Sequence, residues 1–118
     1  MAKTLTLFLT TTPYAFQNTA TALKLAEAGL KQGYEVNLFA SADGVHNFTP
    51  NQQTAGVPNA EQGFRALLDK GLNVELCGSC LRLRGIEGGN VLPGSEPSSM
   101  KKLFAMVGRS DVFITLGT

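Results

Sequence analysis

The chain of 118 residues is 43% hydrophobic and 16% charged, and its formal net charge is +1. That length and apolar content predict a single domain over residues 1–118 with a packed core, and they exclude a disordered segment. The near-neutral charge and the lack of an apolar run approaching about 18 residues give no reason to expect direct nucleic-acid binding or a membrane span.

The first forty residues have the pattern of a β-α-β unit. Alternating leucines predict a strand over residues 4–10, and apolar residues on both of its faces favour a central position. Small and apolar residues at spacings of three and four predict a helix over residues 16–31, which Gly33 ends. Alternation returns over residues 34–40. Two strands joined by one helix and a short link indicate a right-handed parallel connection.

A long polar connection follows over residues 41–58, and a loop of this length is more often functional or covered by a partner than idle. His46 lies in it and could act in acid–base chemistry or partner contact, although a lone loop histidine is more often polar surface, which we favour. Tyr14 and Phe48 are also expected on loops. They could form an apolar rim around a site or a subunit interface, and the interface is favoured.

The second half of the chain continues the alternation of helices and strands. Asn59 is expected to cap a helix over residues 60–70. The other segments are expected as a strand over 73–76, a loop over 85–95, a helix over 99–107 and a last strand over 111–116. The last strand is strongly apolar, which places it inside the sheet. Together these elements predict an α/β fold, a three-layer α/β/α sandwich with a mainly parallel sheet.

Cys77 and Cys80 form a Cys-x-x-Cys motif between the strand over 73–76 and a short helix. Ligands of open parallel sheets bind beyond the carboxyl ends of the strands, so the motif lies where such folds have their active sites. Unpaired N–H groups at a helix start favour a thiolate, and those of Gly78, Ser79 and Cys80 are expected to stabilise the anion. Arg84 either assists them or only fixes the helix end, whereas Arg82 is expected on the solvated face.

Several kinds of chemistry fit this cysteine pair. It could carry sulfur as a persulfide on Cys77, switch between dithiol and disulfide, or supply half of a metal site. A metal is not expected, because zinc needs four ligands and only one histidine is available. The non-functional alternative is that both cysteines are small buried hydrophobic residues. Two cysteines are not a disulfide framework of a secreted protein, so a reducing, cytoplasmic location is expected.

Several segments match a known family in order and spacing. These are Gly33-Tyr34-Glu35-Val36, Asp43-Gly44-Val45-His46-Asn47, Val74-Glu75-Leu76-Cys77 and Arg84-Gly85-Ile86. On these residues the chain resembles the DsrE/DsrF-like family, which includes TusD-type sulfur-relay subunits and YchN-like proteins, over nearly its whole length. The resemblance implies a DsrE-like fold of flavodoxin-like architecture.

The resemblance also implies a function. It indicates a cytoplasmic sulfurtransferase or sulfur carrier that needs no cofactor and exchanges sulfane sulfur with donor and acceptor proteins. The persulfide role falls on Cys77 by its position at the strand end. Cys80, which is not general to the family, is a resolving thiol, a second acceptor or a bystander. Family members assemble as homo- or heteromeric trimers or hexamers. The rival interpretation is a non-catalytic oligomeric assembly module in which Cys77 is merely buried.

Overall fold

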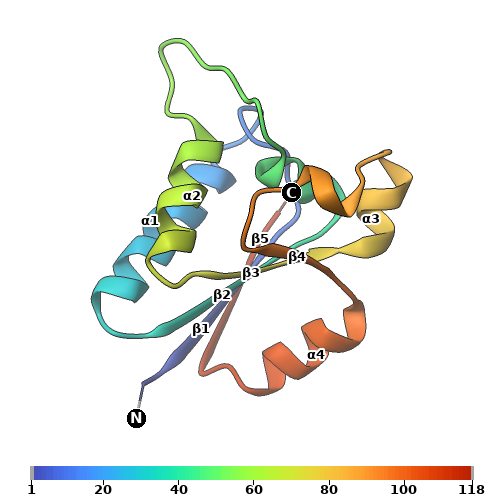
Figure 1. Ribbon diagram of the computed structural model, residues 1–118. Helices are drawn as coiled ribbons and strands as arrows, with labels where there is room; N and C mark the ends of the chain where they lie inside the picture. Colours follow the sequence, from blue (N-terminus) through green and yellow to red (C-terminus); the bar gives the residue numbers. More distant parts are fainter. Residues whose placement is uncertain (1, 118) are drawn as a thin grey trace.

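A parallel sheet between two layers of helices forms the frame of the protein (Figure 1). The computed structural model describes residues 2–117, so Met1 and Thr118 lie outside the described part. The elements are, in chain order, β1 (Thr4–Leu9), α1 (Asn18–Lys31), β2 (Glu35–Ala40), η1 (Ala42–Phe48), α2 (Ala60–Asp69), β3 (Asn73–Cys77), α3 (Gly78–Leu83), η2 (Gly88–Asn90), β4 (Ser95–Ser98), α4 (Met100–Gly108) and β5 (Val112–Leu116).

The strands lie in the order β4-β3-β2-β1-β5, and each neighbouring pair is parallel. The predicted three-layer sandwich and the central position of β1 are therefore confirmed. The expectation that the last strand lies inside the sheet is wrong. Among the strands of residues 2–117, β5 pairs with β1 alone and forms an edge, where Val112 and Phe113 remain 48% and 41% exposed. Its apolar side chains are therefore left partly exposed rather than buried inside the sheet.

β4 is a further difference, because no strand was predicted between the loop over 85–95 and the helix over 99–107. Its residues read Ser-Glu-Pro-Ser, which carries no apolar alternation. The segment is a strand because its backbone pairs with β3, and a proline is tolerated there because β4 is an edge strand. The helix predicted over 99–107 accordingly begins one residue later, at Met100, with the Ser99 side chain as its cap.

The two faces of the sheet have different cores. On one face, leucines of β1 and β2 pack with Val74 and Leu76 of β3 against α1 and α2. On the other face, a smaller cluster joins Phe39 of β2 and Cys77 of β3 to Leu103 and Met106 of α4. Figure 1 shows α1 and α2 on one side of the sheet and α4 on the other.

The long connection after β2 begins with a 3-10 helix, η1, which the sequence did not predict. Gly44 lies so close to β1 that a Cβ atom there would be 2.1 Å from the Leu9 carbonyl oxygen, which explains why glycine is needed. Phe48, expected on an interface or a rim, is instead fully buried, and its ring lies 4.5 Å from that of Phe64. η1 therefore closes the carboxyl end of the sheet as part of the core.

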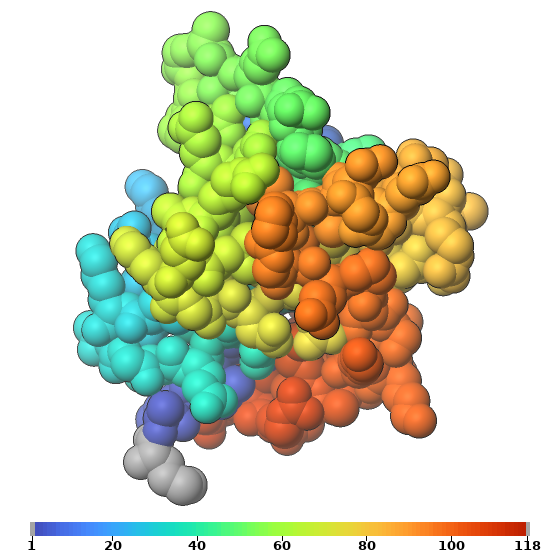
Figure 2. Space-filling view, in the orientation of Figure 1, coloured from blue at the N-terminus to red at the C-terminus, as the bar shows by residue number. Residues whose placement is uncertain are grey.

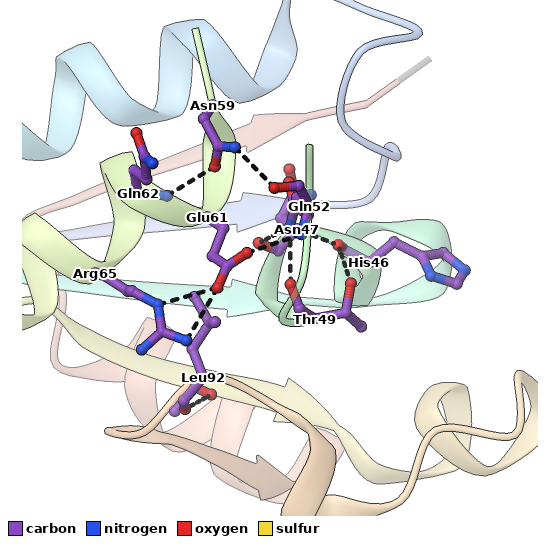
Figure 3. Close-up of polar contacts among 10 residues, drawn as sticks. His46, Asn47, Thr49, Gln52, Asn59, Glu61, Gln62, Arg65 and Leu92 are labelled. Atoms are coloured by element: carbon purple, nitrogen blue, oxygen red, sulfur yellow. Dashed lines mark hydrogen bonds and ion pairs between the residues drawn. The ribbon is translucent and has the colours of Figure 1, made fainter. Parts of the chain in front are cut away.

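The rest of the connection, residues 49–59, stands out from the molecule (green in Figures 1 and 2). Its base is organised by Gln52, as Figure 3 shows. The Gln52 side-chain amide donates to the carbonyl oxygens of His46, Asn47 and Thr49 at 3.4, 3.2 and 3.0 Å. Its backbone N–H donates to Glu61 Oε1 at 2.9 Å. One residue thus ties the end of η1 to the first turn of α2.

The negative charge of the Glu61 carboxylate strengthens this link. Its second carboxylate oxygen accepts from Arg65 Nε and Nη2 at 3.1 and 3.0 Å. The Gln52 N–H, opposed by partial burial and assisted by Arg65, holds the pKa of the Glu61 carboxyl below its ordinary value.

Replacing Glu61 with Gln should lower the free energy of unfolding at neutral pH by about 1 kcal/mol, because glutamine loses the charge that strengthens both contacts. A carboxyl with a depressed folded-state pKa stabilises the protein above its unfolded-state pKa of about 4.3. The difference between Glu61→Gln and the wild type should therefore shrink as the pH falls below that value. Thermal unfolding of both proteins across pH measures it.

The matched control is Glu27→Gln on α1. Glu27 also pairs with a cation one turn later, Lys31, but the pair is 3.7 Å apart and both side chains are more than half exposed. It should have almost no effect, since exposed pairs contribute little. Equal destabilisation by both variants, or a Glu61→Gln difference that persists in acid, would contradict the role of Glu61.

Candidate functional site

The two cysteines lie at the carboxyl edge of the sheet, as predicted, but in different surroundings. Cys77 is the last residue of β3 and the N-cap residue of α3, and its side chain makes no capping hydrogen bond. It is 7% exposed and packs in the cluster of Phe39, Leu103 and Met106. Cys80, one helical turn later, is half-buried, and both cysteines are free thiols. The pair thus combines a covered sulfur with a partly open one.

The Cys80 sulfur accepts hydrogen bonds from the segment between β2 and η1. The Ala42 N–H donates to Cys80 Sγ at 3.1 Å, and the Ser41 hydroxyl lies 3.5 Å from it. Ala42 has a φ of +51°, a left-handed conformation that costs a non-glycine residue roughly 1–2 kcal/mol. This strained conformation directs the Ala42 N–H toward the sulfur.

These donors change the acidity of Cys80. Burial raises the pKa of its thiol, but hydrogen bonding from the Cys77 thiol, the Ser41 hydroxyl and the Ala42 N–H, together with the charge of Arg84, outweighs burial. The net result is a pKa of Cys80 below its ordinary value, which raises the fraction of thiolate at a given pH. Ser41 and Ala42, whose hydrogen bonds to the Cys80 sulfur come from the segment after β2, were missed by sequence reasoning.

Arg84 joins α3 to η1. Its Nε and Nη2 atoms lie 2.9 and 2.8 Å from Asp43 Oδ1, and its Nη1 donates to the Cys80 carbonyl oxygen at 3.2 Å. The residue therefore both closes the end of the short helix and fixes η1 beside the Cys80 sulfur. Asp43 and Arg84 are the charged side chains that bridge these two elements at the cysteine pair.

The other candidates on α3 are placed as follows. Gly78 is buried, and a Cβ atom there would lie 3.1 Å from the Ser98 carbonyl oxygen, so β4 approaches it closely. Ser79 is exposed and accepts a hydrogen bond from Arg82 Nη2 at 3.2 Å. Arg82 is exposed, as expected for the solvated face of the helix.

Tyr14 and His46 do not join the cysteines. The Tyr14 hydroxyl donates to Gln52 Oε1 and accepts from the Ala60 N–H at 3.0 Å, so it ties the loop after β1 to α2. The His46 imidazole points away from the Gln52 network in Figure 3. Within residues 2–117, neither side chain hydrogen-bonds to a cysteine. Tyr14 instead lines an apolar hollow of about 190 Å³ with Phe16, Leu23 and Val57.

Two further kinds of feature, metal sites and membrane-spanning helices, are absent from the described residues. Across residues 2–117, no group of three or more His, Cys, Asp and Glu side chains is placed to hold a metal ion. In the same part of the chain, no helix has the length and apolar character needed to cross a membrane.

Comparison with known proteins gives matches over almost the whole chain. The model of the DsrE/DsrF-like family matches residues 3–116. Uncharacterized protein MJ0989 of Methanocaldococcus jannaschii is 31% identical over 110 residues, which cover 93% of this chain and 96% of that protein. Uncharacterized protein MK0008 of Methanopyrus kandleri is 31% identical over 107 residues, which cover 91% and 88%.

Two solved structures show the same architecture. The ychN protein from E. coli superposes with a TM-score of 0.90 at 25% identity, covering 98% of this chain and 99% of that one. MTH1491 from Methanobacterium thermoautotrophicum superposes with a TM-score of 0.73 at 13% identity, covering 95% and 98%. The second likeness, at this low identity, shows the fold alone.

Proposed function

The chain belongs to the DsrE/DsrF-like family, and from this membership and the geometry of its cysteine pair we propose that it is a cytoplasmic sulfur carrier, or sulfurtransferase. In this proposal Cys77 holds sulfane sulfur as a persulfide and yields it to an acceptor protein. The family is associated with sulfur relay, and Cys77 occupies the strand-end position where the family's cysteine is expected.

The observation that carries the proposal is the pairing of two free thiols with unlike surroundings at the carboxyl edge of the sheet. Carrying a persulfide requires a thiolate that can attack and a place where the sulfur is protected. Cys80 has hydrogen-bond donors that favour its thiolate, and Cys77 is covered by Phe39, Leu103 and Met106. A sulfur held beside this apolar cluster is shielded from thiols in solution.

The transfer itself needs no cofactor. A thiolate attacks the outer sulfur of a donor persulfide, a new S–S bond forms, and the donor leaves as a thiolate with the electron pair of the broken S–S bond. The sulfane sulfur keeps its oxidation state, so neither an oxidant nor a reductant is consumed. The partners are therefore one protein that presents a persulfide and another that presents a thiolate.

We further propose that the protein assembles, either as a homotrimer or homohexamer or as a heteromer with paralogous chains. Large apolar side chains remain exposed on two consecutive elements, α4 and β5. Phe104 on α4 is 70% exposed and Phe113 on β5 is 41% exposed. The outer side of α4 lies open at the lower edge of Figure 2. Large exposed aromatic residues are typical of interaction sites.

Intact mass spectrometry after incubation with a sulfane-sulfur donor, followed by removal of excess donor, tests the carrier function. The wild type should gain the mass of one sulfur atom, and a reductant should remove it. Cys77→Ser should lose its sulfur in a brief chase with a small monothiol, whose thiolate takes the unprotected outer sulfur and leaves Cys80 as a thiolate. Cys80→Ser should retain it, and the Cys77→Ser/Cys80→Ser double variant should never gain it.

Other results would contradict the carrier function and indicate a different one. A loss of two hydrogens without sulfur gain would indicate a Cys77–Cys80 disulfide and a dithiol switch. An unchanged mass together with thiols that label only after unfolding would favour the assembly module.

Assembly is tested by light scattering of the protein as it elutes from a gel-filtration column. The wild type should elute as a trimer or hexamer, and Phe104→Lys should give a smaller species, because a charge would be buried at the interface. Leu83→Lys on α3, where the native side chain is 83% exposed, is the matched control and should leave the mass unchanged. A monomeric wild type, or a mass lowered only by Leu83→Lys, would contradict the proposed surface.

A further inference from the structure

We propose that Cys80 is the thiolate that takes sulfur from the donor, and that Cys77 receives the sulfur from Cys80. This inference rests on the proposed sulfur carriage and gives the two cysteines separate roles in it. The position of Cys77 at the strand end indicates where sulfur is held. It does not indicate which sulfur atom attacks first.

Access is the first argument. An attacking sulfur must approach the outer sulfur of the donor persulfide along the axis of the S–S bond that breaks. Cys77 is 7% exposed and lies against Phe39, Leu103 and Met106. Cys80 is half-buried, so more of this residue than of Cys77 is exposed. Of the two cysteines, Cys80 is therefore the more accessible to a protein donor.

Hydrogen bonding is the second argument. The Ala42 N–H donates to Cys80 Sγ at 3.1 Å, and the Ser41 hydroxyl lies 3.5 Å away. Such donors stabilise the thiolate before it attacks. They also stabilise the negative charge that develops on the same sulfur when it becomes the leaving group in the transfer to Cys77. Among residues 2–117, no comparable donor contact to the Cys77 sulfur is found. The site is thus built to hold negative charge on Cys80.

The donors are also held in place before any substrate binds. The Ser41 N–H donates to the Leu9 carbonyl oxygen at 3.0 Å, and the Gly44 N–H donates to the Ser41 carbonyl oxygen at 2.8 Å. The Asp43–Arg84 ion pair fixes the same turn to α3. A strained backbone that is fixed on two sides and directs an N–H toward a reactive atom is typical of a functional site, and Ala42 with its positive φ fits this description.

The two steps balance. First, the Cys80 thiolate attacks the outer sulfur of the donor R–S–SH, which gives Cys80–S–SH and R–S⁻. Next, the Cys77 sulfur attacks that outer sulfur and its proton moves to Cys80 Sγ, the leaving sulfur, which gives Cys77–S–SH and the Cys80 thiol. One S–S bond breaks and one forms in each step, and no redox partner is needed. Cys77 caps α3 and Cys80 lies in its first turn, packed against the same cluster, so the proton moves between neighbouring side chains.

The test is the rate of sulfur gain, followed by rapid acid quenching and intact mass with the donor still present. Cys80→Ser should gain sulfur at least about tenfold more slowly than the wild type but reach the same end point, because Cys77 must then attack without these donors. Cys77→Ser should gain sulfur at nearly the wild-type rate, with the sulfur located on Cys80 by peptide mass, and should lose it to a small monothiol added after the donor is removed.

Two arginines two positions apart, Arg82 and Arg84, provide a matched control for the charge at Cys80. Arg84→Gln should slow sulfur gain severalfold, and Arg84→Lys, which keeps the charge, should restore most of the rate. Arg82→Gln should leave the rate unchanged, because Arg82 contacts the exposed Ser79 instead.

If Cys80→Ser gained sulfur at the wild-type rate and Cys77→Ser gained none, the proposed order of the two cysteines would be wrong. The carrier function would still stand. No sulfur gain by the wild type would overturn both. The two failures are therefore distinguishable.

Discussion

The hydrogen bond from the Ala42 N–H to the Cys80 sulfur joins the two chain segments on which the site depends. One segment follows β2 and the other follows β3, and these strands are neighbours in the sheet. The Asp43–Arg84 ion pair holds the first segment against the second, and the close approach of Gly44 to the Leu9 carbonyl oxygen holds the first segment against β1. The Gln52 network in turn fixes the far end of η1. A site made by two adjacent βα connections is what the carboxyl edge of a parallel sheet provides.

The two sulfurs of the motif differ because they face different parts of the molecule. A helix-dipole argument favours the cysteine at the helix start, but α3 has only six residues and Cys77 makes no capping bond. Its side chain packs instead into the cluster beneath α4. Cys80 lies beside the turn that begins η1 and obtains its hydrogen-bond donors there. The turn after the neighbouring strand β2, rather than position within the motif, therefore supplies the donors to the Cys80 sulfur.

Much of the frame could be predicted from local pattern. Alternating leucines gave β1, Asn59 capped α2 as expected, and Cys77 does end a strand. The missed features depend on contacts between distant segments. β4 has no apolar alternation and is a strand only because β3 pairs with it, and the apolar β5 could occupy an inner or an edge position with the same sequence.

The hydrogen-bond donors to the Cys80 sulfur could not be predicted from the sequence either. A backbone N–H has no signature in the sequence, and nothing local marks Ala42 as a residue with a positive φ. The family resemblance indicated Cys77 by position but could not show that Ser41 and Ala42 surround the other sulfur. The role of Arg84 was also left open by the sequence. In the structure its side chain binds both Asp43 and the Cys80 carbonyl oxygen.

The most direct test of an acidic Cys80 is alkylation of the native wild-type protein across pH, with each cysteine followed separately by peptide mass. The account predicts that Cys80 reacts first and that its rate rises through a pKa below the ordinary cysteine value of about 8.5, while the covered Cys77 reacts more slowly. Modification of Cys77 before Cys80, or a Cys80 rate that rises only at or above the ordinary pKa, would contradict it.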